Sequence, residues 1–378
     1  MDGFRVGSIL GFEIRIDMSW FVILMLILWS FSRGVFPARY PGQSPEVYLA
    51  MGFVGAILFF ASLLAHELSH SLVARAKGIP VEGITLFIFG GIARTTREAE
   101  KPVDEFVIAG VGPLTSLGIG ALFGAFWRIG LLLGVTPAVT TVAGYLAFLN
   151  VALAIFNLMP GFPLDGGRLF RSIVWRVTGD FTTATRWAST GGKTLGFMLI
   201  GLGVLQLFGG ATLGGVWFIF IGWFLHNAAV MSLRQHLVRS LLDGVFASEM
   251  MSPDPEVVPP SLTLEELVES HFLVMRHQAF PVVEGGRPVG LVTLQHVKGV
   301  PRDSWRSRRV RDVMRDVSEL TVGPRDSMTH ALEQMEVASE RRVLVVDDDR
   351  LVGIISGSDV TTWLQRNAEL ESLREHGG

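Results

Sequence analysis

Long apolar runs alternate with short polar segments up to about residue 232, and beyond that point charge is dense and apolar runs are short. Six of the runs are each roughly long enough to cross a hydrocarbon core of about 30 Å as a helix. They lie near residues 18–36, 51–74, 106–127, 139–159, 194–212 and 213–232. Glycines blur the boundary between the last two. The pattern predicts a polytopic α-helical membrane domain of six transmembrane helices over residues 1–240.

Basic residues predict the orientation of these helices. Arg and Lys residues follow the second and fourth runs, whereas the loop after the third run holds only Arg128 and the loop after the fifth holds none. Short cytoplasmic loops carry the excess of basic residues in membrane proteins, so we expect both termini in the cytoplasm. The segment Met1–Asp17 is mixed and polar, and no small-residue cleavage site follows the first run, which argues against a cleavable signal peptide.

The loop after the second run has the composition of strands. Residues Pro80 to Ala93 read PVEGITLFIFGGIA, in which β-branched and aromatic residues are closed by Gly90-Gly91. We predict a membrane-associated β-hairpin here. An open edge of this hairpin could hold an extended peptide by strand addition. A purely structural hairpin that dips into the membrane is an equal alternative.

From Val245 onward the chain repeats itself. Each copy gives a strand, an amphipathic helix, a Val-rich strand, a turn, a second strand and the start of a helix. Residues 280–283 (FPVV) align with 343–346 (VLVV), and 290–293 (GLVT) align with 353–356 (GIIS). Two such units can bury their sheets against each other. We therefore predict a tandem α/β domain after the membrane domain, with one unit at 241–305 and the second, with a C-terminal tail, at 306–378.

Composition agrees with a membrane protein that carries a soluble appendage. Hydrophobic residues make up 49% of the 378 residues, charged residues 18%, and the mean hydropathy is +0.44. The net charge of -3 indicates no nucleic-acid partner. Cysteine is absent, which excludes disulfides and thiolate ligands. Any metal must therefore sit on histidine, carboxylate, carbonyl or water.

The second apolar run contains the sequence HELSH at residues 66–70. Two histidines four residues apart share one helix face, so His66 and His70 can reach one metal ion, usually zinc. Glu67 between them is placed to polarise a metal-bound water. Ionisable groups are costly in or beside the hydrocarbon layer, which favours a functional site over a helix end with snorkelling polar residues.

A zinc site needs a third protein ligand and an open position for water. Asp165 is the best candidate, because the fourth run ends in the Pro/Gly-rich segment NLMPGFPLDGG, where backbone leaves helix geometry at membrane depth. A plain turn at the membrane surface would have a similar composition. In the expected mechanism Glu67 moves the proton of the water to the leaving amine. Asn157 could donate a hydrogen bond to the substrate or oxyanion, although an Asn at a helix end is commonly a cap.

These motifs resemble the site-2 protease family of intramembrane metalloproteases, in its prokaryotic branch with tandem C-terminal CBS domains. HELSH, the loop Phe89-Gly90-Gly91, Gly112-Pro113 and NLMPGFPLDGG carry the resemblance, which covers nearly the whole chain. It implies zinc on His66, His70 and Asp165, with Glu67 as the catalytic glutamate. It also implies cleavage of a single-pass or membrane-associated protein substrate. Ser116 departs from the family, where a Gly-Pro-x-x-Asn pattern is frequent.

The repeats resemble CBS modules, which implies sensing of adenine nucleotides such as ATP or AMP. The signature Gly-h-x-Ser/Thr-x-x-Asp is matched in the second copy by Gly353, Ser356 and Asp359. The first copy has Thr293, but His296 replaces the aspartate, so that cleft is expected to be degenerate. A CBS pair that serves only for dimerisation or docking is the alternative, and a homodimer through this pair follows family habit.

We therefore expect an intramembrane zinc endopeptidase in a prokaryotic plasma membrane, embedded in the lipid bilayer, with a cytosolic regulatory CBS pair. The alternative from another class is a CBS-gated membrane metal or ion transporter that uses the His/Asp set as a transport site. Glu67 favours hydrolysis, because a transport site does not need a base beside its ligands. The intact motifs argue against a catalytically idle scaffold.

Overall fold

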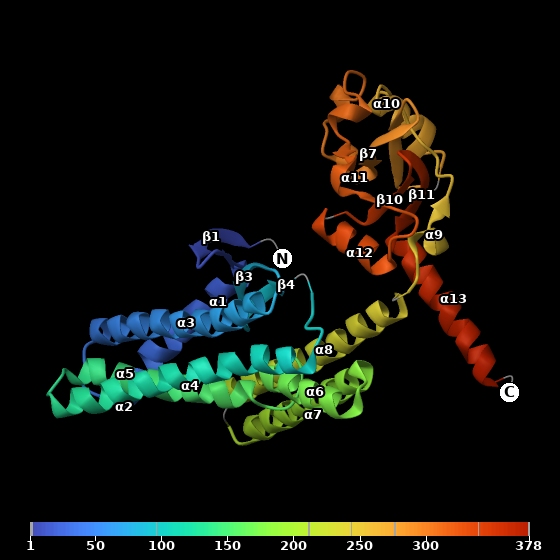
Figure 1. Ribbon diagram of the computed structural model, residues 1–378. Helices are drawn as coiled ribbons and strands as arrows, with labels where there is room; N and C mark the ends of the chain where they lie inside the picture. Colours follow the sequence, from blue (N-terminus) through green and yellow to red (C-terminus); the bar gives the residue numbers. More distant parts are fainter. Residues whose placement is uncertain are drawn as a thin grey trace. The chain divides into compact units, whose positions relative to one another are not determined.

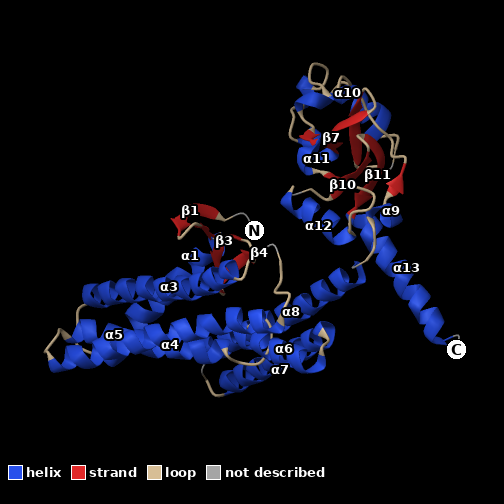
Figure 2. Cartoon of the chain, in the orientation of Figure 1, coloured by secondary structure: helices blue, strands red, loops and turns tan. Residues whose placement is uncertain are grey.

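The computed structural model describes residues 3–376 except 96, 211, 243, 276 and 339. The chain separates into two compact units, Met1–His236 and Leu237–Gly378. Helices dominate the first unit, whereas the second mixes short helices with strands (Figure 2).

The six expected membrane helices are all present, each long and apolar enough to span a membrane. Three of them begin with a proline in the first turn, where the missing N–H costs nothing. Polar turns extend most of the helices beyond the apolar runs. The helices are α1 (Met18–Ser30) continued through a π-helical turn (Phe31–Val35) and α2 (Phe36–Arg39), then α3 (Pro45–Ala76), α4 (Pro102–Leu132), α5 (Pro137–Asn157), α7 (Phe181–Phe208) and α8 (Thr212–Leu242).

Small residues let these helices approach one another closely. Helices α3, α4 and α5 run side by side (Figure 1). A Cβ atom on Gly196 or Gly203 of α7 would lie within 2.7 Å of a backbone oxygen of α8, so the two helices pack backbone to backbone. Close approach through glycine is a usual way for membrane helices to gain van der Waals contact.

A further helix, α6 (Asp165–Thr178), follows the Pro/Gly-rich segment and was not predicted from the sequence. It begins at Asp165 and ends at Gly179, which adopts the left-handed conformation (φ 72°) that favours glycine at a helix end. The segment before α6 packs on α7, because the amide N–H of Phe162 donates to the carbonyl of Ala188 over 3.1 Å. This packing fixes where α6 starts.

A four-stranded sheet lies beside α3 (Figure 1). Its strands are β1 (Phe4–Ile9), β2 (Phe12–Ile16), β3 (Val81–Phe87) and β4 (Gly90–Thr95), in the order β1-β2-β3-β4. The antiparallel pair β3–β4 is the predicted hairpin. It pairs in parallel with β2, an element that the sequence analysis missed, with Glu13 opposite Gly83 and Ile16 opposite Leu86. Strand β4 is left at one edge of the sheet.

The second unit holds two small sheets formed by the repeats. The strands are β5 (Ser252–Pro253), β6 (Ala279–Glu284), β7 (Arg287–Thr293), β8 (Arg315–Asp316), β9 (Thr321–Val322), β10 (Arg342–Asp347) and β11 (Arg350–Ser356). The orders are β5-β11-β10-β9 and β6-β7-β8. Strand β5 of the first copy therefore pairs with the second copy, and β8 of the second pairs with the first. The two copies interlock.

Helices cover these sheets, and a buried core joins the two copies. The helices are α9 (Ala247–Met250), α10 (Leu264–Leu267) with a π-helical turn (Val268–Phe272), α11 (Leu294–Lys298), α12 (Met328–Val337) and α13 (Gly357–His376), with 3₁₀ turns at Arg302–Ser304, Val310–Asp312 and Val317–Glu319. Ala279 and Leu291 of the first copy cluster with Leu320 and Leu344 of the second. The predicted α/β pair thus buries its sheets together.

Candidate metal centre

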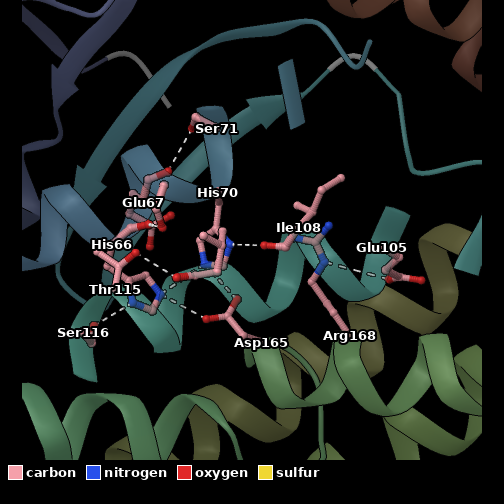
Figure 3. Close-up of polar contacts among 12 residues, drawn as sticks. His66, Glu67, His70, Ser71, Glu105, Ile108, Thr115, Ser116, Asp165 and Arg168 are labelled. Carbon is pink, nitrogen blue, oxygen red and sulfur yellow. Dashed lines mark hydrogen bonds and ion pairs between the residues drawn. The ribbon is translucent and has the colours of Figure 1, made fainter. Parts of the chain in front are cut away.

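His66, His70 and Asp165 come together at one point of the membrane domain. The histidines stack one turn apart on α3, and Asp165 reaches them as the first residue of α6 (Figure 3). One ligand atom from each residue lies within 4.8 Å of the others. His66 Nε2 is 3.0 Å from Asp165 Oδ2, His70 Nε2 is 3.3 Å from Asp165 Oδ1, and the two Nε2 atoms are 3.2 Å apart. Both imidazoles are buried.

The other ring nitrogens are held by α4. His70 Nδ1 donates to the carbonyl of Ile108 over 2.6 Å, and His66 Nδ1 hydrogen-bonds Ser116 Oγ at 2.9 Å (Figure 3). A carbonyl oxygen only accepts, so Nδ1 of His70 carries a proton, and in the neutral ring Nε2 is then the nitrogen with a lone pair. Such contacts fix the tautomer and ring orientation of metal-ligating histidines.

Gly112 of α4 faces both imidazoles. A Cβ atom at this position would lie 2.1 Å from His70 Nε2 and 2.7 Å from His66 Nε2. Contacts under about 3 Å are sterically excluded, so only glycine leaves the space in front of the two nitrogens open. The backbone thereby forms a recess where the lone pairs and the carboxylate converge.

These observations fit a zinc ion. Zinc takes nitrogen and oxygen donors in sites with three protein ligands and one open position. Two imidazole nitrogens and a carboxylate directed at one recess repel each other unless a cation lies between them. The chain has no cysteine that could compete as a ligand.

Glu67 lies beside the two histidines on α3, half-buried (Figure 3). Strand β4 packs directly against its side chain, because a Cβ atom on Gly91 would lie 2.5 Å from Glu67 Cγ. The turn of the hairpin lies at Ile88-Phe89, and the glycine pair expected to close the hairpin begins β4, which places the start of this edge strand over the glutamate. Phe89 of the same turn stacks on Phe224 of α8, with ring centroids 3.6 Å apart.

Within the described part of the chain, Asn157 makes no hydrogen bond to any of the three clustered residues. Asn157 is the last residue of α5, half-buried, and its side chain makes no hydrogen bond to any described residue. It therefore does not serve as a cap, which was the alternative role expected for an Asn at this position.

The candidate nucleotide residues of the second repeat lie where β11 meets α13. The backbone N–H of Ser356 donates to Asp359 Oδ2 over 2.7 Å, and Ser252 Oγ donates to Asp359 Oδ1 over 3.3 Å. Gly353 packs against Met251, whose Sδ would lie 2.5 Å from a Cβ there. Asp359 thus caps the start of the helix and is half-buried.

In the first repeat, Thr293 and His296 take the corresponding positions at the start of α11. His296 N–H donates to Thr293 Oγ1, and Thr293 N–H donates to His296 Nδ1. His296 Nε2 then reaches Glu340 Oε1 of the second repeat at 3.1 Å. The residue that replaces the aspartate therefore bridges the two copies.

Sequence reasoning missed several residues around the centre. Ser116 was noted only because it differs from the family pattern. Ile108 contacts His70 through its backbone carbonyl, which the identity of its side chain does not reveal. The buried ion pair between Arg171 of α6 and Glu105 of α4 was also missed. Its only sequence signal is an acidic residue at the start of an apolar run.

Comparisons with known proteins agree with this architecture. The family model "Peptidase family M50" matches residues 54–134 and 130–199, and the CBS domain model matches 247–302 and 310–366. The chain is 38% identical over 364 residues to the candidate zinc metalloprotease Rip3 of Mycobacterium tuberculosis, spanning 95% of this chain and 92% of Rip3. The chain belongs to peptidase family M50.

Two further proteins are similar to this M50 peptidase, one over nearly the whole chain and one over part of it. The candidate zinc metalloprotease sll0528 of Synechocystis is 33% identical over 368 residues, 96% of each chain. The solved site-2 protease from Methanocaldococcus jannaschii is 25% identical, with a TM-score of 0.43 over 61% of this chain and 95% of that chain. The expected fold class and enzyme class are confirmed: the protein is a zinc metalloprotease with a multi-helix membrane domain and tandem CBS domains. Family membership does not favour the transporter alternative.

Proposed function

We propose that this M50 peptidase cleaves a transmembrane or membrane-associated protein substrate at a zinc site formed by His66, His70 and Asp165. The observation that carries the proposal is the convergence of the three ligand atoms on the recess that Gly112 leaves open. Zinc bound there would supply the Lewis acidity that activates a water and polarises a peptide carbonyl.

The chain's own residues perform the remaining chemistry. Glu67 accepts the proton of the attacking water and delivers it to the leaving amine, a role that suits a carboxylate beside the ligands. Asn157, whose amide has no partner within the described residues, donates a hydrogen bond to the substrate carbonyl. Ser116 and the Ile108 carbonyl keep the imidazoles oriented throughout the reaction.

Strand β4 is the proposed binding edge for the substrate. It is the terminal strand of its sheet, and its second residue, Gly91, packs against Glu67. A helix protects its own peptide bonds by hydrogen bonding, so a substrate must be extended before it is cut. Pairing with β4 satisfies the N–H and C=O groups of the extended segment next to the catalytic glutamate.

The test is a quantitative comparison of membrane proteins from cells that carry wild type, Glu67→Gln or Glu82→Gln. Glu82 is an exposed glutamate in β3 and serves as the matched control. A single-pass protein should accumulate uncut only in Glu67→Gln, whose purified form should keep its zinc. If no protein or fragment differs under varied stress and energy states, the proteolytic role of Glu67 is contradicted.

We also propose that the CBS pair binds ATP or AMP through Gly353, Ser356 and Asp359, whereas the other cleft, which carries Thr293, is degenerate. The match of both repeats to the CBS family supports a sensory role, as does the half-buried carboxylate of Asp359. Calorimetry with AMP and ATP tests the proposed nucleotide binding. Asp359→Ala should abolish binding, and Asp347→Ala, at an exposed position, should preserve it.

We further propose that the protein lies in a prokaryotic plasma membrane with both termini on the cytoplasmic side, and that it forms a homodimer through the CBS pair.

A further inference from the structure

Arg171 of α6 and Glu105 of α4 form an ion pair buried in the membrane domain. Their exposed fractions are 7% and 1%. Arg171 Nε donates to Glu105 Oε1 over 2.8 Å, and Nη2 donates to the same oxygen. The second carboxylate oxygen, Oε2, is buried and has no hydrogen-bond partner within the described residues.

The guanidinium of Arg171 also contacts the segments that flank the metal centre. It lies 5.0 Å from the ring centroid of Phe162, in the segment before Asp165, and 4.5 Å from that of Phe181, the first residue of α7. Its Nη1 is 3.6 Å from a carboxylate oxygen of Glu98, in the loop between β4 and α4. One side chain therefore contacts three segments besides the helix that carries Glu105.

The pair connects the two helices that hold the metal centre. Arg171 lies six residues after Asp165 on α6, and Glu105 lies three residues before Ile108, the acceptor for His70, on α4. The pair is thus within about 9 Å along each helix axis of a group that holds the site. Apolar packing alone would let α6 slide along α4, whereas two N–H groups of one guanidinium that donate to the same carboxylate oxygen make a charge-assisted, directional contact.

A buried ion pair is weak evidence for a purely stabilising role. Removing two charges from water costs several kcal/mol per ion, and well-packed apolar residues of similar size often stabilise a fold as well or better. Here one carboxylate oxygen is additionally left without a partner. The buried pair is therefore better explained by a need to hold α6 in a defined position on α4 than by a contribution to the stability of the fold.

We propose that Arg171 and Glu105 are positioning residues that hold Asp165 at bonding distance from the two histidine ligands. Through Glu98, the same guanidinium links the loop after β4 to the metal-ligand helix, so the edge strand and the ligands share one anchor. This inference rests on the proposed zinc site and adds the residues that set its geometry.

The test measures metal binding and metal geometry in the full-length protein in detergent. Arg171→Met should weaken zinc retention against a chelator by about 10- to 100-fold, the range found when partners of metal ligands are lost. The visible spectrum of the cobalt-substituted protein should change in band position or intensity. The control is Arg176→Met, because Arg176 is exposed on the same helix; its zinc retention and spectrum should stay those of wild type.

Two further variants keep the inference testable if Arg171→Met fails to fold. Arg171→Lys keeps the charge but loses the fork, and should fold with an intermediate loss of zinc retention. The exchange Arg171→Glu with Glu105→Arg should restore retention above that of either single change. Wild-type retention and cobalt spectrum in the folded Arg171→Lys or Arg171→Met would overturn the inference.

Absence of the zinc site and absence of a positioning role for Arg171 would give different results. A wild-type protein that retains no zinc would overturn both. A wild type that binds zinc, together with a Glu67→Gln variant that no longer cleaves, upholds the zinc site. In that case unchanged metal binding in the Arg171 variants contradicts the positioning role alone.

Discussion

Gly112 and His70 are so close that a single methyl group between them would occupy the metal recess, because a Cβ on Gly112 would lie 2.1 Å from His70 Nε2. Gly112→Ala should therefore abolish zinc binding and proteolysis together, with activity reduced by at least about 100-fold, as expected when a ligand geometry is lost. Zinc content by atomic absorption and cleavage of a reporter substrate measure both effects.

The control for this change is Gly118→Ala on the same helix. Nothing lies within 4 Å of a Cβ at Gly118. Alanine there should keep zinc and activity, and should stabilise α4 slightly, because alanine favours helix by up to about 1 kcal/mol over glycine. Equal zinc loss in both variants would indicate damage to α4 as a whole. It would contradict the claim that Gly112 specifically keeps the metal recess open.

Ser116→Ala tests the partner of His66. Removing Oγ leaves His66 Nδ1 without its partner at 2.9 Å, in a site where Ser116 is fully buried. Zinc affinity should fall by about 10-fold or more. Competition with a fluorescent chelator measures the affinity.

Thr115→Val is the matched control for Ser116→Ala. The hydroxyl of Thr115 bonds only to its own helix, through the Val111 carbonyl at 2.8 Å. Its loss should leave zinc affinity within about twofold of wild type, since a bond within one helix turn does not orient a ligand. A fall equal to that in Ser116→Ala would show that Ser116 has no specific role.

The sequence predicted the parts of this protein that local patterns encode. Hydropathy located the six membrane helices, and the four-residue spacing of His66 and His70 implied one shared face. The break after α5 suggested Asp165. Each of these three predictions depends on residues that are close in the sequence or on long segments without charged residues.

Long-range relationships were not predictable in the same way. The parallel pairing of β2 with β3 joins residues about seventy positions apart, and nothing in either strand specifies the partner. Helix α6 was missed because its 14 residues include three arginines and are too few and too polar to stand out as a membrane span, although its apolar residues recur at helical spacing. Likewise, the pairing of Arg171 with Glu105 depends on how α6 docks on α4, which no single segment determines.

Gly91→Ala tests the contact between β4 and the catalytic glutamate. A Cβ on Gly91 would lie 2.5 Å from Glu67 Cγ, so alanine must displace the carboxylate or the strand. Proteolysis should fall by about 100-fold, the lower end of the range for losing a well-placed general base, while zinc binding stays intact. Gly7→Ala, where a Cβ in β1 meets nothing, should leave both unchanged. Loss of zinc in Gly91→Ala would contradict a selective effect on Glu67.

The two CBS clefts differ at one pair of equivalent positions. In the aligned repeats, His296 corresponds to Asp359, and Glu340 corresponds to His277. Of these two pairs, His296 and Glu340 form an ion pair in the described structure, whereas no ion pair is found between Asp359 and His277. The bridge engages the residue that stands where the second repeat has Asp359, so under the proposed nucleotide binding wild type should bind one AMP or ATP per chain. The double variant His296→Asp with Glu340→His transplants the residues of the other cleft and should bind two. Calorimetry gives the stoichiometry, with the exposed His330→Asp as control. Two equivalents in wild type would show that the bridge does not close the cleft.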